Sequence, residues 1–141
     1  MPLGRAVIPL VGLAAVAAAC TPTHYSGALA RASREERALL EARAQSRCPA
    51  PPPHAFTSDG CSAFPDGDWL ACCIEHDFAY WCGGDAAARK SADEGLRACV
   101  SQRGHPGIGN VMYYGVRVGG HPLLPFSWRW GYGWDWPYRY P

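Results

Sequence analysis

Six cysteines restrict the fold of this chain more than any other feature of its sequence. They are Cys48, Cys61, Cys72, Cys73, Cys82 and Cys99. An even set of cysteines in a small exported chain predicts a disulfide framework, because a small apolar core needs covalent reinforcement. Many pairings are possible, and the spacing alone does not select one. A structural zinc site is the alternative use of these thiols, but there is no C-x-x-C pair and an oxidising compartment would consume them.

The indication of export lies at the N-terminus, where residues 6–16 form an apolar run behind Arg5. The run is too short to span a bilayer comfortably and small residues follow it, so residues 1–19 are predicted to be a signal peptide. Residues 17–20, Ala-Ala-Ala-Cys, resemble a bacterial lipobox, whose cysteine becomes an acylated N-terminus. The alternatives are cleavage nearby without lipid, or an uncleaved anchor.

We expect Cys20 to carry the lipid and residues 20–32 to form a tether between this anchor and the folded body, since they are polar and mixed in composition. The protein is then an exported, membrane-anchored lipoprotein that faces the periplasm or the cell surface.

The charge balance excludes one class of partner. The chain has 13 basic and 12 acidic side chains, and loss of Arg5 with the leader would leave 12 of each. Proteins that bind nucleic acid usually present a basic face, so we do not expect a nucleic-acid partner. A mature chain of roughly 120 residues suffices for one small domain. We expect that domain to be monomeric.

Local signals predict a first helix and the loop that follows it. Ser33 and Glu36 have the spacing of a capping box, so a helix is expected over about residues 33–46. Prolines between residues 49 and 53 end it and form a stiff connector. Residues 57–68 are rich in turn formers and are predicted to be a loop.

A second helix is predicted over about residues 69–81. Asp66 or Asp68 is the expected N-cap, and the pair Gly83-Gly84 is expected to end the helix.

The densest group of reactive side chains lies within this second helix. Cys72, Cys73, His76 and Tyr80 fall close to one stripe of the helix, and Asp77 projects about 100° round from His76. One face therefore carries a possible base beside two anchoring cysteines, with a carboxylate at its edge.

A third helix is predicted from Asp85, a good N-cap, to about residue 101. Asp93, Leu96 and Val100 lie on one side of it. A carboxylate in an apolar stripe is either a functional group or a partly exposed residue at the edge of the stripe.

Residues 126–141 have an aromatic side chain at every second position: Phe126, Trp128, Trp130, Tyr132, Trp134, Trp136, Tyr138 and Tyr140. Strict alternation predicts that all of them lie on one side of an extended segment. The segment could pack onto the helices as a strand or coil, or form an aromatic edge at a lipid interface. We favour packing for residues 126–132 and leave the last residues open.

Two motifs together resemble one enzyme family. Cys72-Cys73-x-x-His76-Asp77-x-x-Tyr80 resembles the active-site helix of secreted phospholipase A2. Asp59-Gly60-Cys61-Ser62, followed by Pro65-Asp66, resembles the calcium loop of the short bacterial and fungal branch of that family. The resemblance covers about residues 57–100. It implies a mainly α, disulfide-stapled domain over residues 33–125 with two antiparallel active-site helices, followed here by the aromatic-rich C-terminal extension, residues 126–141.

The resemblance also implies an activity, the calcium-dependent hydrolysis of the sn-2 ester of a glycerophospholipid. His76 would be the general base, Asp93 the carboxylate that orients it, and Tyr80 a phenol that hydrogen-bonds Asp93. Ester hydrolysis needs a base that works near neutral pH, an activated water and stabilisation of the oxyanion, which is consistent with these roles.

Calcium is the cofactor that the resemblance implies. Its ligands would be Asp77, Asp59 and the backbone carbonyl of Gly60. Hard oxygen ligands favour calcium over zinc. The segment between Cys61 and Cys73 is shorter than the bacterial pattern suggests.

The cysteine pairs implied by the resemblance are Cys61 with Cys73 and Cys72 with Cys99, which leaves Cys48 with Cys82. Candidate contacts with a lipid surface, apart from the anchor, are Trp69, Trp81, Trp134 and Trp136.

Two other functions remain open at the level of sequence. The chain could be a non-catalytic envelope lipoprotein that binds lipid on the same scaffold, or a structural envelope protein whose aromatic tail contacts a partner. The expected partners of the hydrolase are a phospholipid substrate and a membrane surface.

Overall fold

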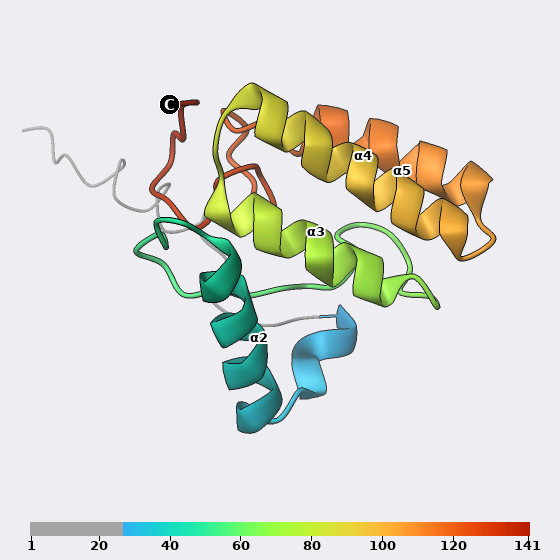
Figure 1. The fold of residues 1–141 in the computed structure, drawn as a ribbon, viewed down its shortest axis with the longest axis horizontal. Helices are drawn as coiled ribbons and strands as arrows, with labels where there is room; N and C mark the ends of the chain where they lie inside the picture. The colour runs from blue at the N-terminus through green and yellow to red at the C-terminus, as the bar shows by residue number, and fades with distance from the viewer. Residues whose placement is uncertain (1–26) are drawn as a thin grey trace, which may run out of the picture.

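The computed structural model describes residues 27–141 (Figure 1). The predicted signal peptide, Cys20 and the first part of the tether lie outside these residues. In order along the chain, the elements are a 3-10 helix η1 Gly27–Arg31 and four α-helices: α2 Arg34–Arg47, α3 Leu70–Cys82, α4 Ala86–Gln102 and α5 Pro106–Gly119. The described part contains no strand. The prediction of a mainly helical, disulfide-stapled protein is confirmed.

The capping signals in the sequence predicted the ends of α2 and α4 to within about one residue. The side chain of Ser33 accepts a hydrogen bond from the Glu36 amide, and the Glu36 carboxylate accepts one from the Ser33 amide, which completes the capping box of α2. The side chain of Asp85 accepts a 2.7 Å hydrogen bond from the amide of Ala88 at the start of α4. Gly83 ends α3 with a φ of 77°, a conformation that favours glycine.

The expected cap of α3 is wrong. The N-cap residue is Trp69, and no side chain caps this end of the helix. The Asp66 carboxylate instead accepts a hydrogen bond from the Cys61 amide at 2.9 Å, inside the preceding loop. The Asp68 carboxylate lies 3.1 Å from Nε2 of His105, at the start of α5. Both carboxylates therefore bind groups outside α3 and do not cap this helix.

Helix α5 was not predicted. Its sequence contains several glycines, which lower helix propensity. Tertiary packing explains why it forms: α5 lies along α4, and Gly109 allows close approach, because a Cβ atom there would lie 2.8 Å from the Arg97 carbonyl oxygen. Pro106 begins the helix at a position that tolerates proline.

Helix α3 lies at the centre of the molecule, with α2 on one side and α4 on the other, and α5 packs beside α4 (Figure 1). Helices α3 and α4 run in opposite directions. Cys72 near the start of α3 is accordingly bonded to Cys99 near the end of α4.

Three disulfides connect these segments. Cys48–Cys82 joins the ends of α2 and α3, Cys61–Cys73 joins the loop to α3, and Cys72–Cys99 joins α3 to α4. This is the pairing that the resemblance implies. The bridges fasten the loop and both flanking helices to α3.

The aromatic tail is part of the core instead of lying as an extended ribbon. Trp130 and Tyr132 are buried in one cluster with Phe56, Phe78 and Trp81. The chain turns repeatedly here, so the expected one-sided extended segment is wrong. Packing is observed for Trp130 and Tyr132, but Phe126 and Trp128 are each 39% exposed.

Backbone hydrogen bonds fasten the tail to the helices. The amide of Trp130 donates to the Gly120 carbonyl, the amide of Gly131 to the Tyr80 carbonyl, and the amide of Gly133 to the Trp81 carbonyl. The tail therefore covers the C-terminal ends of α3 and α5. None of the described helices is both long enough and apolar enough to cross a lipid bilayer.

Candidate functional site

His76 and Asp93 meet across the interface between α3 and α4. The Nε2 atom of His76 lies 2.9 Å from Oδ1 of Asp93. The hydroxyl of Tyr80, one turn further along α3, donates to the same oxygen at 2.8 Å. Asp93 is fully buried and His76 is 8% exposed. The alternative that Asp93 is a partly exposed edge residue is therefore wrong.

The environment keeps Asp93 ionised. Burial alone would raise the pKa of this carboxyl, but hydrogen bonds from His76 and Arg117 together hold the pKa below its usual value. Nη1 of Arg117 donates to Oδ2 of Asp93 at 2.7 Å. An ionised carboxylate only accepts hydrogen bonds, so Nε2 of His76 carries the proton. In a neutral ring with this tautomer, Nδ1 is the acceptor nitrogen.

Tyr80 is held as a hydrogen-bond donor. Burial, followed by the negative charge of Asp93, raises the pKa of its phenol well above the ordinary value. Arg89 is 2% exposed and contacts the Tyr80 phenol. Its Nε atom lies 3.5 Å from the Tyr80 hydroxyl, and its Nη1 atom lies 3.2 Å from the Tyr140 hydroxyl. The phenol therefore stays protonated and keeps its bond to Asp93.

Asp77 lies on the side of α3 that faces the loop. It is 8% exposed, and the hydroxyl of Ser58 donates to its Oδ2 atom. The same hydroxyl accepts a hydrogen bond from the Gly60 amide at 3.1 Å, so Ser58 links the loop backbone to the carboxylate. Burial, and then the charges of Asp59 and Asp66, raise the pKa of Asp77 well above its ordinary value.

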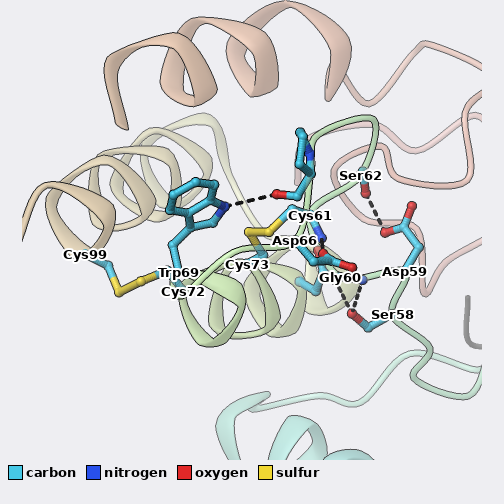
Figure 2. The surroundings of a disulfide bond; sticks show 12 residues. Ser58, Asp59, Gly60, Cys61, Ser62, Asp66, Trp69, Cys72, Cys73 and Cys99 are labelled. Carbon is cyan, nitrogen blue, oxygen red and sulfur yellow. Dashed lines mark hydrogen bonds between the residues drawn. A yellow bond between two sulfur atoms is a disulfide. The ribbon is translucent and has the colours of Figure 1, made fainter. Parts of the chain in front are cut away.

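The loop between residues 58 and 66 is drawn in Figure 2, beside the Cys61–Cys73 disulfide. The Asp59 carboxylate accepts a 2.6 Å hydrogen bond from the Ser62 hydroxyl. Asp66 lies against Gly60, because a Cβ atom added there would be 2.5 Å from its Oδ1 atom. Gly60 has a φ of 77°, so this turn requires glycine for its conformation and for its space.

These oxygen atoms fit calcium in their chemistry. Carboxylates and a backbone carbonyl are the hard donors that calcium prefers, and a cation would stabilise the ionised form of a buried Asp77 close to two further negative charges. Among residues 27–141, no three His, Cys, Asp or Glu side chains form a metal-binding group by themselves. The ligand set that the resemblance implies would add the Gly60 carbonyl to two carboxylates, those of Asp77 and Asp59.

An apolar cavity of about 330 Å³ opens beside His76 and Asp77. The loop contributes Phe64, α4 contributes Leu96, and α5 contributes Met112 and Val116 to its wall. Its lining also includes Gly60, Tyr80, Val111, Phe126 and Trp128. An apolar molecule in this cavity would lie directly against the imidazole.

The four tryptophans expected at a lipid surface do not line this cavity. Trp81 is 1% exposed and donates from Nε1 to the His54 carbonyl, so its predicted interfacial role is wrong. Trp69 is half-buried and bonded to the Pro65 carbonyl (Figure 2). Trp134 and Trp136 are half-buried, and their Nε1 atoms donate to backbone carbonyls.

The sequence reasoning missed several residues of the site. Ser58 directly precedes Asp59, and its place in the loop was the only available signal. The aromatic alternation indicates Phe126 and Trp128 but does not indicate that they line a cavity. No local pattern marked Arg89 or Arg117, because their partners are distant in the chain.

Comparison of the chain with protein-family models, with curated proteins and with solved structures gave no match.

Proposed function

We propose that the protein is a phospholipase A2-like carboxylic ester hydrolase that cleaves the sn-2 ester of glycerophospholipids and depends on calcium. The observation that carries the proposal is the contact between Nε2 of His76 and Asp93 at the wall of an apolar cavity. It supports the proposal because a histidine held by a carboxylate beside an apolar space would suit a base acting on the ester of a lipid.

In this mechanism His76 removes a proton from the attacking water through Nδ1. Asp93 accepts the hydrogen bond from Nε2, which fixes the tautomer and stabilises the imidazolium that forms. Tyr80 donates to Asp93 and limits rotation of the carboxylate. The imidazolium then returns the proton to the leaving alcohol.

Asp77, Asp59 and the Gly60 carbonyl are the residues that would hold calcium. When bound, a calcium ion supplies positive charge for the developing oxyanion and for the phosphate of the substrate. Ser58 orients the Asp77 carboxylate, and the Cys61–Cys73 disulfide restrains the loop close to α3.

The cavity supports a lipid substrate. Val111, Phe126 and Trp128 contribute to its lining and are also exposed, so an acyl chain could enter there from an apolar surface. The setting that we propose is the exported lipoprotein described above, anchored at Cys20 and acting as a monomer at a membrane surface.

The test is release of fatty acid from mixed micelles of phosphatidylcholine and detergent, with calcium and with a chelator. We expect activity only with calcium, and a loss of at least roughly a hundredfold in His76→Gln. His105→Gln is the matched control, because His105 pairs with Asp68 and packs against the Trp69 ring, and none of these three residues lines the cavity.

Activity that ignores calcium, or that survives in His76→Gln, would refute the proposal. Binding of calcium and of liposomes without turnover would favour the non-catalytic lipid-binding alternative. If replacement of the exposed Phe126 and Trp128 by alanine abolished capture of a partner protein and no turnover was found, the structural alternative would be favoured.

A further inference from the structure

Asp93 has a partner that the mechanism above does not use. Its Oδ1 atom accepts hydrogen bonds from His76 and Tyr80, whereas Oδ2 accepts a 2.7 Å hydrogen bond from Nη1 of Arg117. A second guanidinium, that of Arg89, lies further away, with Nε 4.0 Å from Oδ2. Arg117 therefore makes the direct ion pair with this fully buried carboxylate.

The backbone that carries Arg117 is itself fastened to α4. Nη2 of Arg89 donates to the Arg117 carbonyl at 2.7 Å and to the Val116 carbonyl at 3.0 Å. Arg89 and Asp93 both belong to α4, and Arg117 belongs to the last turn of α5. Arg89 of α4 thus bonds the backbone of α5, and Arg117 of α5 bonds the side chain of Asp93 in α4. These bonds fix the position from which the Arg117 guanidinium approaches Asp93.

This contact has two consequences for the base. Burial of a carboxylate is unfavourable unless its charge is paired, and Arg117 supplies that pairing. A charge-assisted bond at Oδ2 also restricts rotation of the carboxylate, so Oδ1 remains directed at the imidazole. Without Arg117, Oδ2 would lose its direct charged partner, and the hydrogen bonds at Oδ1 alone would orient the carboxylate.

We propose that Arg117 is a positioning residue for the His76–Asp93 pair. It acts through Asp93 and does not need to contact the substrate. The inference rests on the proposed function, since the pair contributes to catalysis only if the protein hydrolyses an ester.

The test compares Arg117→Met, which removes the charge and the donors, with Arg117→Lys, which keeps the charge. Arg97→Met is the matched control: Arg97 belongs to α4, is half-buried, and has its guanidinium 4.7 Å from the centre of the Tyr113 ring. The ion pairs of Asp93 are with His76, Arg89 and Arg117, not with Arg97. The measurements on the full chain are kcat and KM for phosphatidylcholine in mixed micelles, at one pH and with saturating calcium.

We expect kcat to fall roughly ten- to hundredfold in Arg117→Met, with KM within about twofold of the wild-type value. Arg117→Lys should lose roughly three- to tenfold in kcat, because an ammonium group cannot reproduce the planar donor geometry. Arg97→Met should behave as wild type. A change in KM alone, or equal losses in Arg97→Met, would overturn the inference.

A second readout does not depend on activity. The ¹⁵N NMR spectrum of the His76 ring, assigned by its absence in His76→Gln, reports which nitrogen carries the proton. At the same fixed pH, the share of the Nε2–H tautomer should fall in Arg117→Met and stay unchanged in Arg97→Met. An inactive wild type that shows this change would refute the proposed function and support the role of Arg117.

An unchanged tautomer in Arg117→Met, or wild-type kcat in an active protein, would overturn the role of Arg117. If circular dichroism shows that Arg117→Met does not fold, Arg117→Lys decides by the same two readouts. A wild-type kcat or a wild-type tautomer in Arg117→Lys then overturns the inference, and the expected losses support it.

Discussion

Replacement of Gly120 by alanine should destabilise the protein, because a methyl group has no room there. A Cβ atom at this position would lie 2.6 Å from both Cε1 and the hydroxyl oxygen of Tyr80. The backbone cannot easily move away, since the Gly120 amide donates to the Val116 carbonyl and the Gly120 carbonyl accepts from the Trp130 amide. The φ of Gly120 is −93°, which alanine adopts readily, so the effect is steric.

The expected magnitude follows from these contacts. Overpacking by one methyl group costs about 1–3 kcal/mol, and loss of the buried hydrogen bond from Tyr80 to ionised Asp93 costs about 1.5–3 kcal/mol. Replacing glycine by alanine also lowers the entropy of the unfolded chain, which stabilises the folded state by about 0.4–1 kcal/mol. Because Tyr80 relaxes in part, we expect a net loss of about 2–3 kcal/mol, which lowers Tm by on the order of 10 °C.

Gly115→Ala is the matched control. Gly115 lies inside α5, and a Cβ atom there would meet nothing within 4 Å. Alanine should therefore stabilise the helix by about 0.5–1 kcal/mol and raise Tm by a few degrees. Thermal unfolding followed by circular dichroism, with the disulfides intact, measures both variants. A Gly120→Ala protein as stable as wild type, or two variants that shift Tm in the same direction, would refute the steric argument.

Three further predictions concern charge and covalent structure. Calcium affinity should fall as the pH falls through the pKa of Asp77, which burial raises, because a proton and calcium compete for that carboxylate; calorimetric titration at several pH values measures this. The folded-state pKa of Asp93 is lowered, so its ionised form contributes stability above the unfolded pKa that is lost as the pH falls through the folded pKa. Asp93→Asn should therefore lower Tm at neutral pH. The decrease of Tm with falling pH should also be smaller in this variant than in the wild type. Replacing Cys48 and Cys82 together by alanine should cost about 4 kcal/mol, measured by urea unfolding, because their bridge spans 34 residues.

Each of these three predictions has a result that would contradict it. Calcium affinity that is constant across acid pH would show that Asp77 is not a ligand or does not titrate in that range. A Tm profile of Asp93→Asn parallel to that of the wild type would show that Asp93 contributes no pH-dependent stability. An unchanged urea midpoint in the cysteine variant would show that the bridge does not constrain the unfolded chain.

Short-range patterns were sufficient for part of the fold. The capping box at Ser33 and the N-cap at Asp85 act within one helical turn, so α2 and α4 could be predicted from neighbouring residues. The break after α3 could be predicted for the same reason, because Gly83 adopts a positive φ. The cap of α3 could not, since Asp66 and Asp68 have partners outside the helix.

In the candidate site, too, some features could be predicted from neighbouring residues and others depend on distant segments. The spacing of His76 and Tyr80 places both on one face of a helix, and Asp93 lies on the buried stripe of the next helix. Their contact was therefore a reasonable prediction from the resemblance, and the structure brings the three together. The cavity beside them could not be predicted, because its walls come from the loop, α4, α5 and the tail.

The sequence by itself thus determined the elements whose signals are local: the caps, the breaks and the faces of the central helices. Only the tertiary structure decided that a glycine-containing segment becomes α5, that Trp130 and Tyr132 enter the core, and that Arg117 reaches Asp93. The physical reason is the separation along the chain of the residues that interact. Capping and periodicity depend on neighbours within a turn or two, whereas burial and ion pairing depend on which distant segments pack together.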